Sequence, residues 1–298
     1  MDHPLRAATA LLLIALAGGA DADVRRLAPA AYPEGPLWHN DRLLYVEYAQ
    51  HTIRAWDGRR SAVLWRHAGC GPSSLIAFGA DHLLVACYDS NSVLELDAAW
   101  HEVRTIDRDR DGYAFQGPND FCADGHDGVY LSASGVYDLK APISGAILHL
   151  TADGQLRRVA ETIHYANGLT LSADGRSLLV AEMLAARLLS FEVLADGTLG
   201  ARRVWARLQD LARPTPGADA YNGPDGVKRA ADGDLYIAQN GSGRVLVVSP
   251  AGRLRRILTV PTPFVTNVAL DPSGNVYITG VFDQWHAPYP GALFRVAP

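Results

Sequence analysis

The sequence predicts an all-β protein with the fold of a six-bladed β-propeller, and three observations support that prediction. A turn followed by a short apolar strand recurs six times along the 298 residues. Equivalent strand positions lie 39, 46, 49, 57 and 41 residues apart, by subtraction between Tyr45, Leu84, Tyr130, Leu179, Tyr236 and Tyr277. Each unit then ends in a second apolar run and a polar turn. Repeats of about 40–50 residues with several short strands are typical of propeller blades, whereas the alternative, a β-sandwich, has no reason to repeat at this period.

The blades follow one another along the chain without a linker or low-complexity segment, so residues 21–298 are expected to form a single domain. We expect Val24–Leu27 to form a strand that completes the last blade by pairing with the unit Asn267–Val296. The connections 107–117 and 209–221 are longer and polar, and are expected to lie over one face of the ring. The expected blade cores are residues 34–66, 73–106, 119–159, 167–205, 225–258 and 267–297.

Residues 1–20 have the pattern of a signal peptide. Arg6 supplies a positive charge, Ala7–Ala17 is an apolar run, and Gly18-Gly19-Ala20 places small residues at a cleavable junction. Eleven apolar residues are too few to span a bilayer, and an amphipathic or buried N-terminal helix is the alternative. We therefore expect an exported protein of the bacterial periplasm or the extracellular medium, with no membrane association after cleavage.

Composition limits the partners. The formal net charge is −5 and the isoelectric point is near 6.0, and no basic run indicates nucleic-acid binding. Cys70, Cys87 and Cys122 allow either a Cys70–Cys87 disulfide with one free thiol or three buried thiols. The sequence leaves both this choice and the oligomeric state, monomer or dimer, open.

Four polar residues stand where the innermost strand of a blade begins: Glu34, Asn119, Asn167 and Asp225. Inner strands of a propeller converge on the central channel, so these side chains are expected to face one another. Two carboxylates and two amide oxygens suit a hard cation, Ca²⁺ before Mg²⁺ or Mn²⁺, while Zn²⁺ usually takes His or Cys. The predicted fold is thus an all-β six-bladed β-propeller with a central metal site.

Taken singly, each of these residues is typical of an ordinary turn, because Asn-Gly and Asp-Gly pairs are common there. The pair Asp232-Gly233, for example, predicts a tight hairpin turn, whereas Asp225-Gly226 opens a strand. Their shared place in four repeats favours the metal site. Ser73 and Asn267 occupy the matching place in the second and sixth blades, as weaker candidates.

The sequence resembles the SMP-30/gluconolactonase/LRE family over about residues 30–280. The phrases that carry the resemblance are Glu-Gly-Pro-x-Trp at 34–38, Pro-Asn-Asp at 118–120, Asn-Gly-Leu-x-Leu-Ser-x-Asp-Gly at 167–175, Pro-Asp-Gly at 224–226 and Gly-Arg-Val at 243–245. The resemblance implies a calcium-dependent lactonase with Glu34, Asn167 and Asp225 as metal ligands. It also implies that Asn119 touches the substrate or the metal, and that Asp225 is the general base.

Two positions depart from the pattern of the family. Gly117 stands where its sugar-lactone members carry Arg, and Ser132-Ala133 replaces a Thr-Asp pair that many bacterial members have. A less polar lactone or another ester is therefore an alternative substrate to a sugar-acid lactone.

The expected reaction is hydrolysis, with the cation as Lewis acid on the carbonyl, Asp225 activating water and Asn119 positioning the substrate. No Gly-x-Ser-x-Gly elbow or His-Glu-x-x-His pattern indicates another route. Asp120 is expected to brace its loop. The pocket rim is expected to include Tyr137, Tyr221, Trp285 and His286. Related phosphotriesterase or strictosidine-synthase-like chemistry, and a non-catalytic ligand- or protein-binding propeller, are the alternatives.

Overall fold

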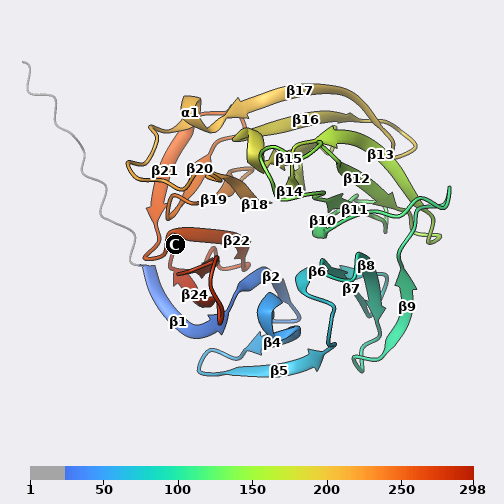
Figure 1. Ribbon diagram of the computed structural model, residues 1–298, viewed down its shortest axis with the longest axis horizontal. Coiled ribbons are helices and arrows are strands. Elements are labelled where there is room, and N and C mark those ends of the chain that lie inside the picture. The colour runs from blue at the N-terminus through green and yellow to red at the C-terminus, as the bar shows by residue number, and fades with distance from the viewer. Residues whose placement is uncertain (1–23) are drawn as a thin grey trace, which may run out of the picture.

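A computed structural model, which describes residues 24–298, has six four-stranded antiparallel sheets arranged around a central axis (Figure 1). This arrangement confirms the predicted six-bladed propeller. The first blade is β2 (Pro33–His39), β3 (Arg42–Glu47), β4 (Thr52–Trp56) and β5 (Ser61–Arg66). The second is β6 (Pro72–Phe78), β7 (His82–Cys87), β8 (Ser92–Leu96) and β9 (Glu102–Ile106). The third is β10 (Pro118–Ala123), β11 (Val129–Ala133), β12 (Gly145–Leu150) and β13 (Leu156–Ile163).

The other half of the ring repeats the same plan, with the first strand of each blade nearest the axis. The fourth blade is β14 (Ala166–Leu171), β15 (Ser177–Glu182), β16 (Arg187–Val193) and β17 (Leu199–Arg207). The fifth is β18 (Gly223–Arg229), β19 (Leu235–Asn240), β20 (Arg244–Val248) and β21 (Leu254–Thr259). The sixth is β22 (Phe264–Leu270), β23 (Val276–Val281) and β24 (Pro290–Val296), joined by β1 (Val24–Ala31).

The strand β1 closes the ring. It pairs antiparallel with β24, from Val24 opposite Val296 to Ala31 opposite Pro290, and Figure 1 shows β1 beside β24. The strand runs four residues beyond the expected Val24–Leu27. The predicted signal peptide lies outside the described residues.

The apolar core lies between neighbouring blades. One cluster joins Leu179 and Leu188 of the fourth blade to Val227, Ile237 and Leu246 of the fifth, all almost without solvent exposure. Because each blade is buried on both faces, its middle strands are continuous apolar runs, which is why the repeats are visible in the sequence.

In the part of the chain that the structure describes, three short helices lie in the connections: η1 (Tyr48–Gln50), η2 (Met183–Ala185) and α1 (Leu208–Leu211). Within residues 24–298, no helix is long and apolar enough to cross a membrane. Cys70 and Cys87 form a disulfide between the segment before β6 and the end of β7, and Cys122 is a free, half-buried thiol. The structure thus selects the first of the two alternatives for the cysteines.

Every inner strand carries an irregularity near its start. The register with the second strand of the blade slips at Glu34/Leu37, Pro72/Ser74, Pro118/Phe121, Ala166/Leu169, Pro224/Val227 and Val265/Asn267. Such bulges bend a strand and re-aim its side chains. All four candidate metal-site residues lie at these bulges.

Candidate active site

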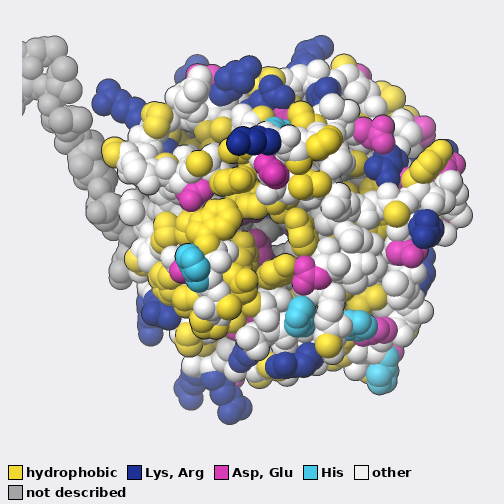
Figure 2. Space-filling model, in the orientation of Figure 1, with side chains coloured by type: hydrophobic (Ala, Val, Ile, Leu, Met, Phe, Trp, Pro, Cys, Tyr) yellow, Lys and Arg dark blue, Asp and Glu magenta, His cyan; other side chains and the backbone are white. Residues whose placement is uncertain are grey.

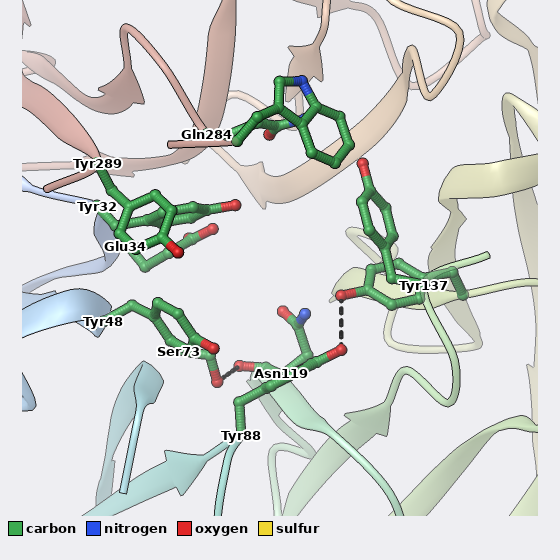
Figure 3. A pocket seen from close by; sticks show the side chains of 11 residues that line it. Tyr32, Glu34, Tyr48, Ser73, Tyr88, Asn119, Tyr137, Gln284 and Tyr289 are labelled. Carbon is green, nitrogen blue, oxygen red and sulfur yellow. Dashed lines mark hydrogen bonds between the residues drawn. The ribbon is translucent and has the colours of Figure 1, made fainter. Parts of the chain in front are cut away.

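The four predicted residues lie near the starts of four different inner strands, β2, β10, β14 and β18. Glu34 and Asn119 are half-buried and line a pocket of about 240 Å³ (Figure 3). Asn167 and Asp225 are buried, with 3% and 4% of their surfaces exposed. Two of the four thus face the pocket and two lie within the packed interior.

A glycine follows three of these residues, and close packing explains why. A Cβ added to Gly168 would come within 2.3 Å of the backbone N of Val227, and one added to Gly226 within 2.1 Å of Asn267 Oδ1. A Cβ on Gly35 would come within 2.4 Å of Ser74 Cα. Gly168 and Gly226 do not have positive φ, so they serve here as points of contact between blades and not as turn residues. Gly233, in contrast, has φ +90° and forms the predicted hairpin turn.

The two carboxyl groups interact strongly. Burial, followed by the charge of Asp225, raises the pKa of Glu34 well above its ordinary range. Burial raises the pKa of Asp225 to about 8, and the charge of Asp120 adds to this while the amides of Asn240 and Asn167 oppose it. Two desolvated carboxyl groups close together resist carrying two negative charges unless a cation compensates them.

Unsatisfied oxygens in this cluster fit a hard cation. Asn167 donates from Nδ2 to Met183 Sδ at 3.4 Å, but its buried Oδ1 has no hydrogen-bond partner. Asn240 donates from Nδ2 to Asp225 Oδ2 at 3.0 Å, and its own buried Oδ1 is also without a partner. Buried acceptors are rarely left without a partner, so these atoms indicate a ligand. Carboxylate and amide oxygens are the donors that Ca²⁺ and Mg²⁺ prefer.

The cluster of possible cation ligands needs amide oxygens in addition to its carboxylates. Within the part of the chain that the structure describes, no three His, Cys, Asp or Glu side chains gather into a metal-binding group. The weaker candidates have structural contacts instead. The Ser73 hydroxyl lies 2.9 Å from the main-chain oxygens of both Pro118 and Asn119, and Asn267 Oδ1 accepts from the backbone N–H of Val268 at 2.9 Å.

A second polar cluster, the Asp120 cluster, consists of Asp120, Lys228 and Asn267. Lys228 Nζ lies 2.9 and 2.8 Å from the two carboxylate oxygens of Asp120, and Asn267 donates to the same carboxylate at 3.3 Å. The backbone N–H of Phe121 also donates to Asp120, as the bracing role predicted for this residue requires. The ion pair joins the third blade to the fifth across the channel, so Asp120 braces more than its own loop.

The pocket wall is aromatic. Seven of its side chains form a ring that we name the aromatic collar: Tyr32, Tyr48, Tyr88, Tyr137, Tyr165, Trp285 and Tyr289. Figure 2 shows hydrophobic side chains, a class that includes Tyr and Trp, around a central hollow on this face. Along one side of the collar, ring centroids lie 5.9 Å (Tyr289–Tyr32), 5.3 Å (Tyr32–Tyr48) and 6.2 Å (Tyr48–Tyr88) apart. On the other side they lie 4.7 Å (Tyr137–Tyr165) and 6.3 Å (Tyr137–Trp285) apart.

The hydroxyl of Tyr165 joins the two sides by donating to that of Tyr88 at 3.1 Å. Three collar residues have left-handed backbone, Tyr32 (φ 49°), Tyr165 (φ 63°) and Tyr289 (φ 54°). This conformation costs a residue with a side chain about 1–2 kcal/mol. Strain of this kind persists where the fold needs a side chain in one place, and here it turns the rings into the pocket.

Of the four rim candidates, Tyr137 and Trp285 line the pocket. Tyr221 packs against both, with its ring centroid 4.8 Å from that of Tyr137 and 5.6 Å from that of Trp285. His286 instead is exposed and bonds Asp283. The two departures from the family pattern also have structural counterparts. A Cβ on Gly117 would come within 2.8 Å of the Tyr88 ring, so Tyr88 occupies the space beside this position. Ala133 is buried among apolar side chains and supplies no acid.

Sequence reasoning missed most of the collar, although a signal was present. Tyr32 and Tyr165 each stand two residues before a predicted metal ligand, Glu34 and Asn167 respectively. A repeat-by-repeat alignment would have shown this shared position. Asn240 and Lys228, in contrast, give no signal in the sequence, because their partners are 15 and 108 residues away.

Fold and site together define a class of protein: a six-bladed β-propeller whose central pocket ends in a cluster of carboxylate and amide oxygens. Residues 32–296 match the SMP-30/Gluconolactonase/LRE-like region. The chain therefore belongs to the SMP-30/gluconolactonase/LRE-like family.

Sequence relatives include named lactonases. L-arabinolactonase from Azospirillum brasilense is 31% identical over 157 residues, which cover 50% of this chain and 49% of that protein. Lactonase drp35 from Staphylococcus saprophyticus is 28% identical over 140 residues, 45% of this chain and 40% of that protein. The chain thus matches about half or less of the length of these relatives.

Solved structures share the fold over almost the whole chain. A gluconolactonase from Xanthomonas campestris superimposes with a TM-score of 0.76 at 21% identity, covering 93% of this chain and 90% of that one. Regucalcin from Agrobacterium tumefaciens, described as a calcium-binding protein, gives a TM-score of 0.75 at 17% identity, covering 92% and 93%.

Proposed function

We propose that this protein is an exported lactonase that requires a divalent cation, with Glu34, Asn119, Asn167 and Asp225 holding the cation. The observation that carries the proposal is the buried Asn167 Oδ1, which has no hydrogen-bond partner. The amide of Asn167 lies next to Asp225, and burial raises the pKa of Asp225 and of Glu34, which interacts with it. Ca²⁺ fits this all-oxygen set best, with Mg²⁺, Mn²⁺ or Zn²⁺ as substitutes. Family membership and the named lactonase relatives support the choice of reaction.

Export is part of the proposal. The expected leader at residues 1–20 supports it, and so does the Cys70–Cys87 disulfide, because disulfides persist mainly in oxidising compartments.

When bound, the cation would supply a Lewis acid for the lactone carbonyl. Asp225 would take a proton from the attacking water, and Asn240, which donates to its Oδ2, would hold the carboxylate in place. The same proton would pass to the ring oxygen as the C–O bond breaks, so that a hydroxy acid leaves and Asp225 is ready again. Asn119 would orient the substrate, since the Ser73 hydroxyl lies against its main-chain oxygen and helps to fix the strand while the side chain points into the pocket (Figure 3).

The test is a pH-stat assay of the full-length secreted protein, stripped with a chelator, on a panel of aliphatic, sugar-derived and aromatic lactones. We expect hydrolysis to vanish on chelation and to return when Ca²⁺ is titrated in. Glu34→Gln should raise the Ca²⁺ concentration needed for half-maximal recovery by about tenfold or more, because one charged ligand is lost. Full activity in the stripped protein, or no turnover of any lactone with any divalent cation, would overturn the proposal.

A further inference from the structure

We infer that the protein has a second ligand site, separate from the central pocket, which binds an anion carried on a flat ring. The site is a cleft of about 500 Å³ between the first and sixth blades, and we name it the basic cleft. Its principal side chains are Trp38, Trp56, Arg25, Arg42, Arg59 and Arg295. The cleft shares no lining residue with the central pocket, so the inference goes beyond the proposed function.

The basic cleft lies at the opposite end of the inner strand from the candidate active site. Glu34 stands near the start of β2 and lines the central pocket, whereas Trp38 stands four residues later and lines the cleft. Four residues of extended strand cover about 13 Å. Two tight turns border the cleft: Asn40 and Asp41, with φ of 48° and 57°, join β2 to β3, and residues 57–60 join β4 to β5. Left-handed residues of this kind are typical of two-residue hairpin turns, which hold the wall in a fixed position.

Positive charge exceeds negative charge in the cleft. Four arginines and two aspartates line it, although the whole chain has a formal net charge of −5. Within residues 24–298, none of these four arginines forms an ion pair. Asp57 is already engaged, because its Oδ1 accepts the backbone N–H groups of Arg59 and Arg60 and its Oδ2 pairs with the Arg60 side chain. Among the lining residues, Asp41 is therefore the one carboxylate left to balance four guanidinium groups.

The arginine on β24 is held in place without direct neutralisation. Arg295 donates from Nε and Nη2 to Asn275 Oδ1 at 3.0 and 2.6 Å. Asn275 in turn donates to Asp271 at 2.6 Å, so a neutral amide separates Arg295 from that carboxylate. Guanidinium groups bind carboxylates and phosphates through two parallel hydrogen bonds, so this set of arginines favours an anion of either kind.

Two indole rings form the apolar part of the cleft. Trp38 and Trp56 are half-buried and pack on the core between the first and sixth blades. Trp38 stacks on Tyr277, with ring centroids 5.6 Å apart and an angle of 14° between the ring planes. Rings that are fixed in this way can pack against a ligand ring with little loss of conformational entropy.

The arginines and the indole rings together define the class of ligand. A cleft of about 500 Å³ lies within the roughly 300–1,000 Å³ of small-molecule sites, so it can hold two fused rings and an acidic group. An uncharged ring would leave the arginines unengaged, and a bare anion would leave the indole rings in water. The shared chemistry is a flat ring with a phosphate or carboxylate group, and the experiment separates the two groups.

The cleft also spans the place where the ring closes. Arg25 on β1 and Arg295 on β24 belong to the sixth blade, whereas Arg42 on β3 and Trp56 on β4 belong to the first. A ligand that contacts both blades would add contacts between them and would stabilise the folded ring in proportion to its occupancy.

The first experiment is calorimetry of the full-length protein with four probes: 2-naphthyl phosphate, 2-naphthoate, uncharged 2-naphthamide and inorganic phosphate. We expect at least one naphthyl anion to bind about tenfold or more tightly than both 2-naphthamide and inorganic phosphate, because it alone engages arginines and rings together. Added NaCl should weaken this binding, since the charges are near the surface. The tighter naphthyl anion identifies the acidic group. Equal affinity for 2-naphthamide or for inorganic phosphate, or no binding of either naphthyl anion, would overturn the inference.

The second experiment places the site. Arg42→Gln and Arg59→Gln should each weaken the naphthyl anion by about three- to tenfold, because a charged hydrogen bond is lost, and Trp56→Leu should remove its advantage over inorganic phosphate. The matched control is Arg203→Gln, at an exposed arginine of β17 outside the cleft, which should change neither affinity. The lactone kcat should stay within about twofold in all four variants, since none of these residues lines the central pocket. Arg42→Gln and Arg59→Gln variants that both bind like the wild type would refute the site, and Arg59 lies in an exposed turn where folding is not at risk.

Amide hydrogen exchange gives a readout that binding elsewhere would not produce. With saturating naphthyl anion, exchange in β1 and β24 should slow by about threefold or more relative to exchange in β13 of the third blade. Slowing confined to the strands around the central pocket would place the ligand there and would overturn the inference.

Discussion

Two polar clusters lie at the central channel: the proposed cation site and the Asp120 cluster. Two neighbouring residues of one strand, Asn119 and Asp120, belong to different clusters. Asn119 faces the pocket beside Glu34, whereas Asp120 belongs to the Asp120 cluster with Lys228 and Asn267. Asn119 and Asp120 both lie at the bulge of β10, and Asn267 lies at the bulge of β22. The Asp120 carboxylate is bonded on both oxygens, while the site around Asp225 retains two buried amide oxygens without partners.

The comparison separates a brace from a binding site. A buried charge whose bonds are complete within the protein fixes the ring and needs no ligand. A buried cluster with unfilled acceptors and carboxyl groups of raised pKa is costly to the protein alone and becomes favourable when a cation binds. The following predictions test this distinction, beginning with the largest effect.

Asp225→Asn should lower kcat by about a thousandfold, because an amide cannot take a proton from water. The same change should leave the cation-free protein at least as stable as the wild type at pH 8, since it removes a buried acid. Steady-state kinetics and thermal unfolding measure the two effects. The matched control is Asp232→Asn in the exposed Asp232-Gly233 turn, which should change kcat less than twofold; a similar loss there would undermine the assignment.

Asp120→Ala should destabilise the fold by about 2–4 kcal/mol, because Lys228, which is only half-buried, would lose its partner. Urea unfolding of the cation-free protein measures this. The double variant Asp120→Leu, Lys228→Met removes both charges and should recover most of the loss. A cost below about 1 kcal/mol for Asp120→Ala would mean that the pair is not a brace.

Gly168→Ala should cost about 1–3 kcal/mol, since the new methyl group would press on the backbone N of Val227 in the next blade. The control is Gly200→Ala, where the nearest atom, 3.1 Å away, is the end of the Glu192 side chain. Equal unfolding midpoints for the two variants would argue against tight contact between blades at the site.

The stabilisation by Ca²⁺ should grow by up to about 1.4 kcal/mol per pH unit for each proton released as pH rises toward 8. Burial raises the pKa of Asp225 to about 8, so the folded, cation-free protein holds a proton that the unfolded chain releases above about pH 4. Stability without the cation therefore falls as pH rises between these values, and Ca²⁺ offsets the fall. Melting temperatures with and without Ca²⁺ from pH 5 to 8 measure this, and a constant difference would contradict it.

Most of the fold, and about half of the residues of the candidate site, could be predicted from the sequence. The recurring apolar strands, such as those at Tyr45 and Tyr236, predict the blades because strands buried on both faces read as continuous apolar runs. The positions of Glu34 and Asp225 follow from the same repeat. The pairing of Asp120 with Lys228 does not, because it depends on how six blades close around an axis and on no local spacing. The role of Gly168 could not be predicted for a related reason. An Asn-Gly pair in a sequence indicates a turn, and only the structure shows that Gly168 packs against the neighbouring blade.

The pairing of β1 with β24 makes the first and last described strands of the chain hydrogen-bonded neighbours. Synthesis must therefore reach the final strand before the ring can close, and until then β1 and β23 present open edges to other chains. A chain cut short before β24 would keep both edges exposed permanently. Aggregation, more than loss of activity, is the expected fate of such a fragment.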